Sequence, residues 1–148
     1  MKPKIYLDTC SIQRPLDSKD QLRIVLEVEA VLGILSLIEM NKVDLISSEM
    51  LLFEINRNSN QIRKEYALEV ISKAKHFSIV NAKIEIRSRE FDRFGVQPFD
   101  SVHLASAEEA HADYFCTCDD ELMKKAKKIK DLKIKIVSPL ELVKEILK

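Results

Sequence analysis

The chain has 148 residues, and its 24 Lys and Arg residues are balanced by 24 Asp and Glu residues, so its formal net charge is zero. This length suits one domain with a hydrophobic core of its own. The hydrophobic content of 46% argues against intrinsic disorder. The charge balance excludes a uniformly basic protein held to nucleic acid by bulk attraction, so any such partner must be recognised locally.

The composition also indicates a compartment. Three cysteines are an odd set, which is unsuited to a disulfide framework, and reduced thiols are the default in the cytosol. The first residues show no secretory signal, and no apolar run approaches the roughly 18 residues that span a bilayer. We therefore expect a cytoplasmic protein with no membrane contact, folded as a single domain over residues 1–148.

The first part of the chain predicts two strands and two helices. Residues 4–7 are short and apolar, as in a buried strand, and the polar stretch after them predicts a loop to about residue 20. Apolar residues then recur at helical spacing over residues 21–41, which predicts a long and deeply packed helix. Residues 44–46 predict a second strand, and the two serines after it can cap a helix that runs to about residue 57.

The middle of the chain is mainly helical. Residues 62–76 repeat the helical pattern, and residues 77–80 fit either a strand or an extended connection, of which we favour the connection. Residues 82–94 predict a helix closed by Gly95, and Pro98 begins another helix that extends to about residue 112.

The last part of the chain alternates between strands and helices. Residues 113–117 and 134–137 predict strands, residues 119–130 predict a helix, and Pro139 begins a helix that runs to the end. Short apolar strands that alternate with helices imply a parallel sheet covered on both faces. The sequence therefore predicts one α/β domain.

Four acidic residues from distant segments fall where such a sheet binds ligands. Asp8 directly follows the first strand, and Asp119 follows the third strand after one residue. Glu54 lies about two turns after the second strand, and Asp100 lies near the start of its helix. Taken singly, each has an ordinary explanation, such as a helix cap or a solvated helix face. Together they lie at positions near the carboxyl ends of the strands, where ligands collect in open parallel sheets.

The negative charges of clustered carboxylates repel one another and must be compensated. Two carboxylates about 4–5 Å apart repel by roughly 3–4 kcal/mol at an effective dielectric constant near 20. The cluster must therefore take up protons, pair with Lys or Arg, or bind a cation. Oxygen ligands without a set of His or Cys suit Mg²⁺ or Mn²⁺. These ions activate water and neutralise charge in the hydrolysis of phosphodiesters.

The sequence resembles the PIN domain, the metal-dependent ribonuclease fold of VapC-type toxins. The matching segments are Ile-Tyr-Leu-Asp-Thr at residues 5–9, Ser-Ser through Glu-Ile at 47–55, Phe-Asp-Ser-Val-His-Leu-Ala-Ser-Ala at 99–107 and Phe-Cys-Thr-Cys-Asp-Asp at 115–120. Their order and spacing cover residues 5–138. The resemblance implies a three-layer α/β/α fold with a central parallel sheet of four to five strands.

The resemblance also implies roles for the matched residues. The catalytic acids and metal ligands would be Asp8, Glu54, Asp100 and Asp119. Supporting roles would fall to Thr9, Thr117 and Asp120. We prefer Glu54 to Glu49 as the second acid because it precedes Ile-Asn-Arg, as the acid of the family precedes an aliphatic and then a basic residue.

Basic residues and one histidine extend this set. Arg14 and Arg57 lie a few residues from proposed ligands and can hold the scissile phosphate. His103 stands three residues after Asp100 and could share its helix face, although the family often has a His here that is not a ligand. The lysines within residues 124–135 fit a solvated helix face or a track for an RNA backbone.

We predict a Mg²⁺- or Mn²⁺-dependent endoribonuclease that hydrolyses RNA with a metal-activated water. The resemblance implies a toxin-type enzyme restrained by an antitoxin protein, and it is compatible with a homodimer. The alternative is a non-catalytic PIN-like module that binds RNA or a protein partner. A phosphatase of the haloacid-dehalogenase type would need a second Asp two residues after the first, where this chain has Cys10.

Overall fold

A computed structural model describes residues 2–148 of the chain, and Met1 lies outside the described residues. Its centre is a five-stranded sheet in the order β3-β2-β1-β4-β5, in which every neighbouring pair is parallel. In chain order the strands are β1 (Lys4–Leu7), β2 (Asp44–Ser48), β3 (His76–Ser78), β4 (Tyr114–Cys116) and β5 (Lys135–Val137). The prediction of an α/β fold with a central parallel sheet is confirmed.

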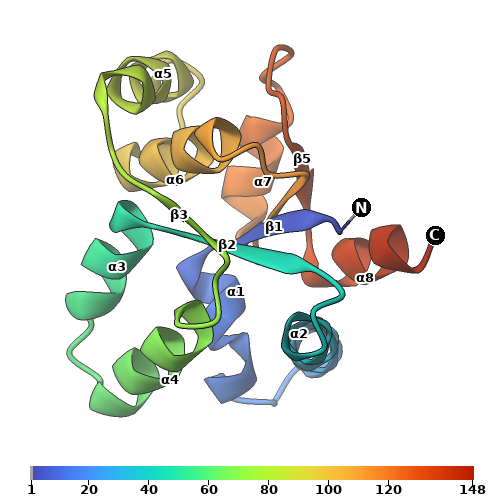
Figure 1. Ribbon diagram of the computed structural model, residues 1–148. Coiled ribbons are helices and arrows are strands. Elements are labelled where there is room, and N and C mark those ends of the chain that lie inside the picture. The colour runs from blue at the N-terminus through green and yellow to red at the C-terminus, as the bar shows by residue number, and fades with distance from the viewer. Residues whose placement is uncertain (1) are drawn as a thin grey trace.

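Helices cover both faces of the sheet (Figure 1). One layer contains α5 (Ala82–Asp92), α6 (Pro98–Glu109) and α7 (Asp120–Ala126). The other layer contains α1 (Thr9–Gln13), α2 (Leu22–Glu39), α4 (Gln61–Ile71) and α8 (Pro139–Leu147). The remaining helix, α3 (Glu49–Asn56), follows directly from β2 and contacts both α4 and α6. This is the predicted three-layer arrangement.

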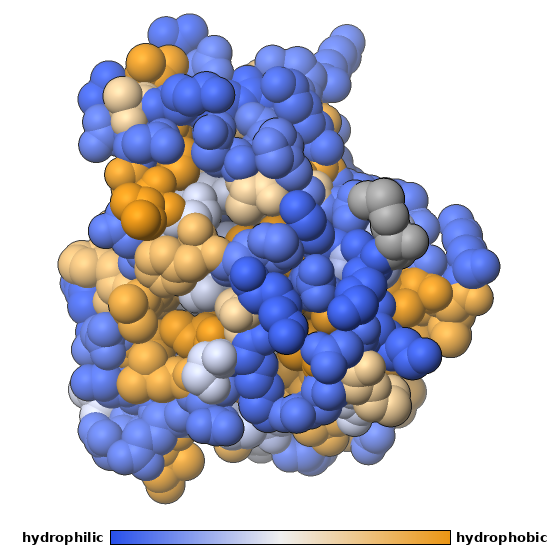
Figure 2. Space-filling model, in the orientation of Figure 1, coloured by the Kyte–Doolittle hydropathy of each residue, from blue (hydrophilic) through white to orange (hydrophobic). Residues whose placement is uncertain are grey.

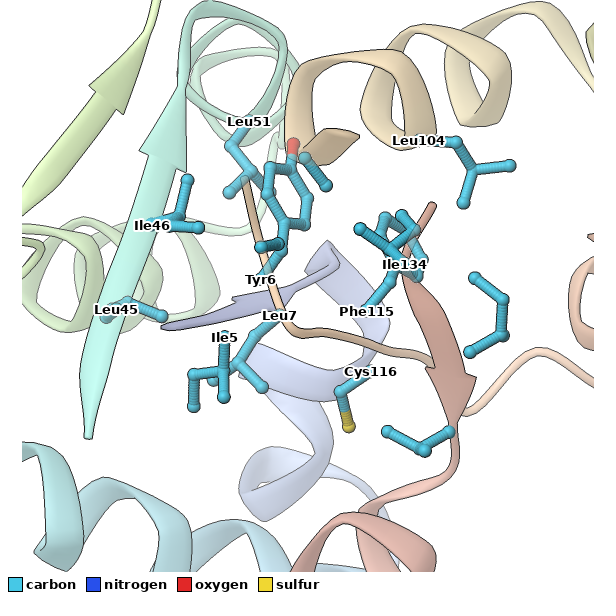
Figure 3. Close-up of a cluster of buried hydrophobic side chains, with 14 of the residues drawn as sticks. Ile5, Tyr6, Leu7, Leu45, Ile46, Leu51, Leu104, Phe115, Cys116 and Ile134 are labelled. Carbon is cyan, nitrogen blue, oxygen red and sulfur yellow. The ribbon is translucent and has the colours of Figure 1, made fainter. Parts of the chain in front are cut away.

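The middle of the sheet is apolar because both of its faces are buried. Successive side chains of a strand point to opposite faces, so Ile5 and Leu7 enter one layer and Tyr6 enters the other (Figure 3). All three are fully buried, and the Tyr6 ring stacks on Phe115 of β4 with 5.2 Å between ring centroids. Burial of each large side chain contributes about 1.5–3 kcal/mol. The short apolar runs in the sequence therefore form the centre of the core.

The order of the strands creates a crevice at one edge of the sheet. From β1 the chain builds outward through β2 and β3, and it then returns to the other side of β1 as β4 and β5. The helices that follow β1 and β4 consequently leave toward opposite layers (Figure 1). Open α/β sheets bind ligands at such a reversal point, beyond the carboxyl ends of the strands. Asp8 and Asp119 both lie beside this point.

The prediction of a loop from residue 8 to about residue 20 is wrong in its first half. Residues 9–13 form α1, and a 3₁₀ turn follows at Arg14–Leu16. The Asp8 side chain begins the helix, because its Oδ1 atom accepts a hydrogen bond from the Ser11 N–H at 3.0 Å. One aspartate therefore both ends the first strand and caps the first helix.

The preference for an extended connection at residues 77–80 is wrong for residues 77 and 78. Residues 76–78 form β3, which pairs in parallel with residues 46–48 of β2. This strand lies at the edge of the sheet, and Phe77 is exposed there. A three-residue strand with an exposed central side chain lacks the apolar run that identifies the other strands. No helix within residues 2–148 is long and apolar enough to cross a membrane.

Candidate functional site

Asp8 is held at the junction of β1 and α1. Its Oδ1 atom accepts the Ser11 N–H at 3.0 Å and the Cys10 thiol at 3.1 Å. Burial raises the pKa of Asp8 above its ordinary value, and these hydrogen bonds oppose the shift. The side chain is thus fixed in position by its own helix cap, in surroundings that only partly compensate its charge.

Glu54 reaches the same crevice from α3. Burial tends to raise the pKa of Glu54, but hydrogen bonds from His103 and Thr9 hold it below its ordinary value. The Thr9 hydroxyl donates to Glu54 Oε1, and His103 Nε2 lies 3.2 Å from the same oxygen. Glu49, the other acid on this helix, accepts the Val80 N–H at 2.6 Å instead. The structure therefore directs Glu54 to the crevice and Glu49 to the connection after β3.

His103 belongs to a buried chain of hydrogen bonds that the sequence analysis missed. Its Nδ1 atom lies 2.6 Å from the Tyr6 hydroxyl, which lies 2.7 Å from Ser48 Oγ. Because the carboxylate of Glu54 can only accept, His103 Nε2 donates to it, and the hydroxyls of Tyr6 and Ser48 continue the chain on the other side of the ring. The signal in the sequence was Tyr6 itself, since a tyrosine inside a buried strand needs a hydrogen-bond partner.

Asp119 comes from the turn between β4 and α7. Its Oδ1 atom accepts the N–H groups of Glu121 at 2.9 Å and Leu122 at 3.2 Å, so it caps α7. Its own N–H donates to Thr117 Oγ1 at 3.0 Å, which gives Thr117 the supporting position expected for it. The next residue, Asp120, points to solvent and pairs with Arg23 at 2.7 Å. Of the two adjacent aspartates, only Asp119 faces the crevice.

The four predicted acids line one hollow of about 280 Å³. The residues around it are Asp8, Thr9, Cys10, Gln13, Glu54, Asp100, His103 and Asp119. Asp100 enters from the first turn of α6. Burial raises the pKa of Asp100 to about 6, and repulsion from the other three acids adds to the shift, while His103 opposes it. Four segments that are distant in sequence therefore meet around a charge-rich space.

Comparison with solved structures identifies the fold. VapBC2 from Rickettsia felis, crystallised with a DNA fragment from its promoter, aligns at 13% identity over 91% of this chain and 98% of its own, with a TM-score of 0.56. PAE2754 from Pyrobaculum aerophilum aligns at 13% identity over 98% of this chain and 90% of its own, with a TM-score of 0.56. The chain has a PIN-like fold. No family model and no curated protein matches the sequence.

The donor atoms of this PIN-like domain suit a hydrated hard cation. Among residues 2–148, no group of three or more His, Cys, Asp or Glu side chains is placed to hold a metal ion. Mg²⁺, however, commonly binds through one or two carboxylates, with water and substrate phosphate completing its shell. Asp100, whose pKa is raised by burial next to three other acids, supplies the uncompensated charge that such an ion would neutralise. The oxygen atoms of these carboxylates are therefore suitable ligands for a Mg²⁺ ion.

Two cationic side chains flank the carboxylates. A hollow of about 250 Å³ shares Asp100 and Asp119 with the central one and is also lined by Lys125. A hollow of about 300 Å³ shares Thr9 and Glu54 with the central one and is also lined by Arg57. Glu54 follows β2 and Asp119 follows β4, and these two strands flank β1 on opposite sides. The PIN-like domain thus has three adjoining hollows, with the four acids around the central one and one cation in each of the other two.

Arg14, the second predicted phosphate ligand, lies outside these hollows. Its guanidinium group pairs with Glu27 at 2.6 Å and with Asp17 at 3.0 Å. Glu27 is almost fully buried, and Arg23 approaches its other oxygen at 3.4 Å. Arg14 therefore compensates a buried carboxylate of α2, and of the two predicted arginines only Arg57 adjoins the acids.

Proposed function

We propose that this PIN-like domain is a Mg²⁺- or Mn²⁺-dependent endoribonuclease that hydrolyses RNA phosphodiester bonds. The observation that carries the proposal is the single hollow lined by four acids from four segments of the chain. Its place at the reversal point of a parallel sheet is where such folds bind ligands. A metal-dependent nuclease needs acidic side chains for the ion and basic side chains for the phosphates of the substrate. Here Lys125 and Arg57 each line a hollow that also contains one or two of the acids.

The four acids would hold the ion, which when bound would activate a water molecule and offset charge on the phosphodiester. Thr9 and His103 keep Glu54 ionised and oriented through their hydrogen bonds to its carboxylate. The Asp8 and Asp119 side chains are fixed by the helix caps that they form.

Arg57 and Lys125 would hold the RNA backbone on the two sides of the acids. The guanidinium group of Arg57 can bind a phosphate through two parallel hydrogen bonds. Lys125 supplies a compact charge at the opposite hollow. We retain a restraining antitoxin and a homodimer as parts of this proposal, because the resemblance to VapC-type toxins implies the first and is compatible with the second.

The test is cleavage of a labelled RNA by the purified protein with Mn²⁺, with Mg²⁺ and with EDTA. We expect cleavage that depends on the metal and that Asp100→Asn reduces by at least a hundredfold. Asp92→Asn is the matched control, because Asp92 is an exposed aspartate on α5 outside the hollows. Cleavage that persists both in EDTA and in Asp100→Asn would mean that a contaminating nuclease or a different site is responsible.

The non-catalytic alternative remains a second candidate because of one observation. The described residues contain no ready group of three metal-ligating side chains. Calorimetric titration with Mn²⁺ separates the two candidates, since the nuclease requires binding and a pure RNA- or protein-binding module does not. Heat of binding in the wild type that is lost in Asp100→Asn would favour the nuclease.

A further inference from the structure

Two phenylalanine rings lie side by side on the surface next to the acids. Phe53 of α3 is 51% exposed and Phe99 of α6 is 41% exposed. Their ring centroids are 5.9 Å apart, and the ring planes meet at 83°. Hydrophobic residues gather around α3 on the face drawn in Figure 2. Exposed aromatic pairs lose the free energy that burial provides, so this surface favours a ligand that covers it.

Arg57 packs against both rings. Its guanidinium carbon lies 5.4 Å from the centre of Phe53 and 5.6 Å from the centre of Phe99. Phe53 and Arg57 are four residues apart, so α3 presents them on the same side. Within the described part of the chain, the positive charge is in contact with these rings and not with a carboxylate at ion-pair distance.

The aromatic pair is continuous with the carboxylate hollow. Phe99 and Arg57 line the hollow of about 300 Å³ together with Asn58, Thr9 and Glu54, and the last two also line the space between the acids. Part of a ligand that covers Phe99 would therefore lie in the hollow that adjoins the acids. Through Phe99 the pair thus adjoins the acids, unlike the other large exposed apolar side chains among the described residues.

We propose that Phe53, Phe99 and Arg57 form a stacking site for an unpaired nucleobase next to the scissile phosphate of single-stranded RNA. The proposal rests on the ribonuclease function proposed above and names the form of its substrate. Aromatic rings and guanidinium groups both stack on bases, and this stacking requires a base that is free of its helix. The phosphate attached to that base would lie within reach of the Arg57 charge.

The charge on Arg57 favours RNA over an apolar protein segment. A protein side chain that covered the two rings would also remove the guanidinium group from water, and burial of a charge without a partner is costly. A nucleotide brings the base for the rings and the phosphate for the guanidinium in one ligand. Binding of a protein segment at this place is accordingly an outcome that the experiment must be able to detect.

The experiment measures RNA binding without cleavage, in the Asp100→Asn background. The probe is a fluorescein-labelled single-stranded RNA of about ten nucleotides, compared with the same strand in a duplex. Replacement of both rings by leucine keeps apolar surface but removes the stacking faces. We expect the single strand to bind this variant about 5- to 100-fold more weakly, and the duplex to bind more weakly than the single strand to the parent protein.

Phe77→Leu is the matched control. Phe77 is 52% exposed, lies on the edge strand β3 and lines none of the three hollows, so we expect unchanged affinity. Melting temperatures verify that each variant is folded. Equal affinity of the double leucine variant and its parent would overturn the stacking site, and so would equal loss in Phe77→Leu or an absence of RNA binding.

The same variants separate this inference from the proposed function. Metal-dependent cleavage by the wild type, combined with unchanged RNA affinity of the leucine variant, overturns the stacking site alone. Weaker RNA binding by the leucine variant, combined with no cleavage by the wild type under any metal, supports the stacking site and overturns the nuclease. Leucine substitutions that weaken only the binding of a protein partner would assign the surface to that protein and overturn the RNA site.

Discussion

Removal of one carboxylate from the central hollow is expected to stabilise the metal-free protein. The change is Asp100→Asn, which keeps the size and shape of the side chain and removes its charge. In the absence of a cation, Asp100 is partly buried next to Asp8, Glu54 and Asp119, and among residues 2–148 no lysine or arginine lines the same hollow. The amide lacks the repulsion that the ionised carboxylate experiences there.

The sign and size of the effect follow from the pKa of Asp100. Burial raises this pKa from 3.8 to about 6, so the folded protein binds the proton more tightly than the unfolded chain does. The corresponding stability is fully present below a pH of about 4 and is lost as the pH rises through about 6. A shift of this size corresponds to about 3 kcal/mol, and the access of water to the carboxyl group reduces it to about 1–2 kcal/mol.

The assay is thermal unfolding in EDTA at two pH values. At pH near 7.5 we expect Asp100→Asn to melt about 2–8 °C above the wild type, and at pH near 4 we expect the difference to vanish. Asp120→Asn is the control. Arg23 lowers the pKa of this exposed carboxyl group, so removal of the charge is not expected to stabilise the protein. A variant that is no more stable than the wild type near pH 7.5, or equally more stable at both pH values, would refute the reasoning.

Three further changes test other parts of the structure. Tyr6→Phe leaves Nδ1 of buried His103 without a partner and should lower the free energy of unfolding in urea by about 1–3 kcal/mol, whereas a neutral effect would contradict the hydrogen-bond chain. Glu27→Gln removes the charge that pairs with Arg14 and should cost about 3 kcal/mol in the same assay, more than any exposed pair would. Mn²⁺ at a hundred times its dissociation constant should stabilise the wild type by about 2.7 kcal/mol, measured as a higher melting temperature, and should act much less on Asp100→Asn.

Most of the fold was predictable because local signals agree with the tertiary structure. Four of the strands contain a short run of buried apolar side chains, such as Ile5–Leu7 in β1 and Leu45 and Ile46 in β2. Ser48, Pro98 and Pro139 mark the starts of helices, and the structure has α3, α6 and α8 beginning there. The edge strand β3 was not predictable in this way, because its pairing with β2 is made by backbone groups and leaves Phe77 exposed.

The acids of the site could be predicted from the sequence, but the side chains that pair with the site residues could not. Asp8, Asp100 and Asp119 follow strands or begin helices, Glu54 lies in the helix that directly follows β2, and parallel topology brings such positions to one edge of the sheet. Whether Arg14 faces that edge depends on α2, whose buried Glu27 lies 13 residues away and binds the guanidinium group. The partners of Glu54 likewise come from α1 and α6, and only the folded chain brings them together.

The zero net charge is the sum of an uneven arrangement, and this bears on how a polyanion could bind. Arg14, Arg23, Arg63 and Arg87 are each paired with carboxylates, so their charges are compensated locally. Screening at physiological salt reduces interactions beyond about 8 Å, which makes adjoining charges count far more than distant ones. Around the acids the adjoining cations are Arg57 and Lys125, each in a hollow of its own. A strand of RNA would therefore be attracted at two points that lie on either side of the acids, and repelled between them unless a cation occupies the hollow. The same geometry that disfavours RNA on the metal-free protein would place its phosphate at the acids once the metal is bound.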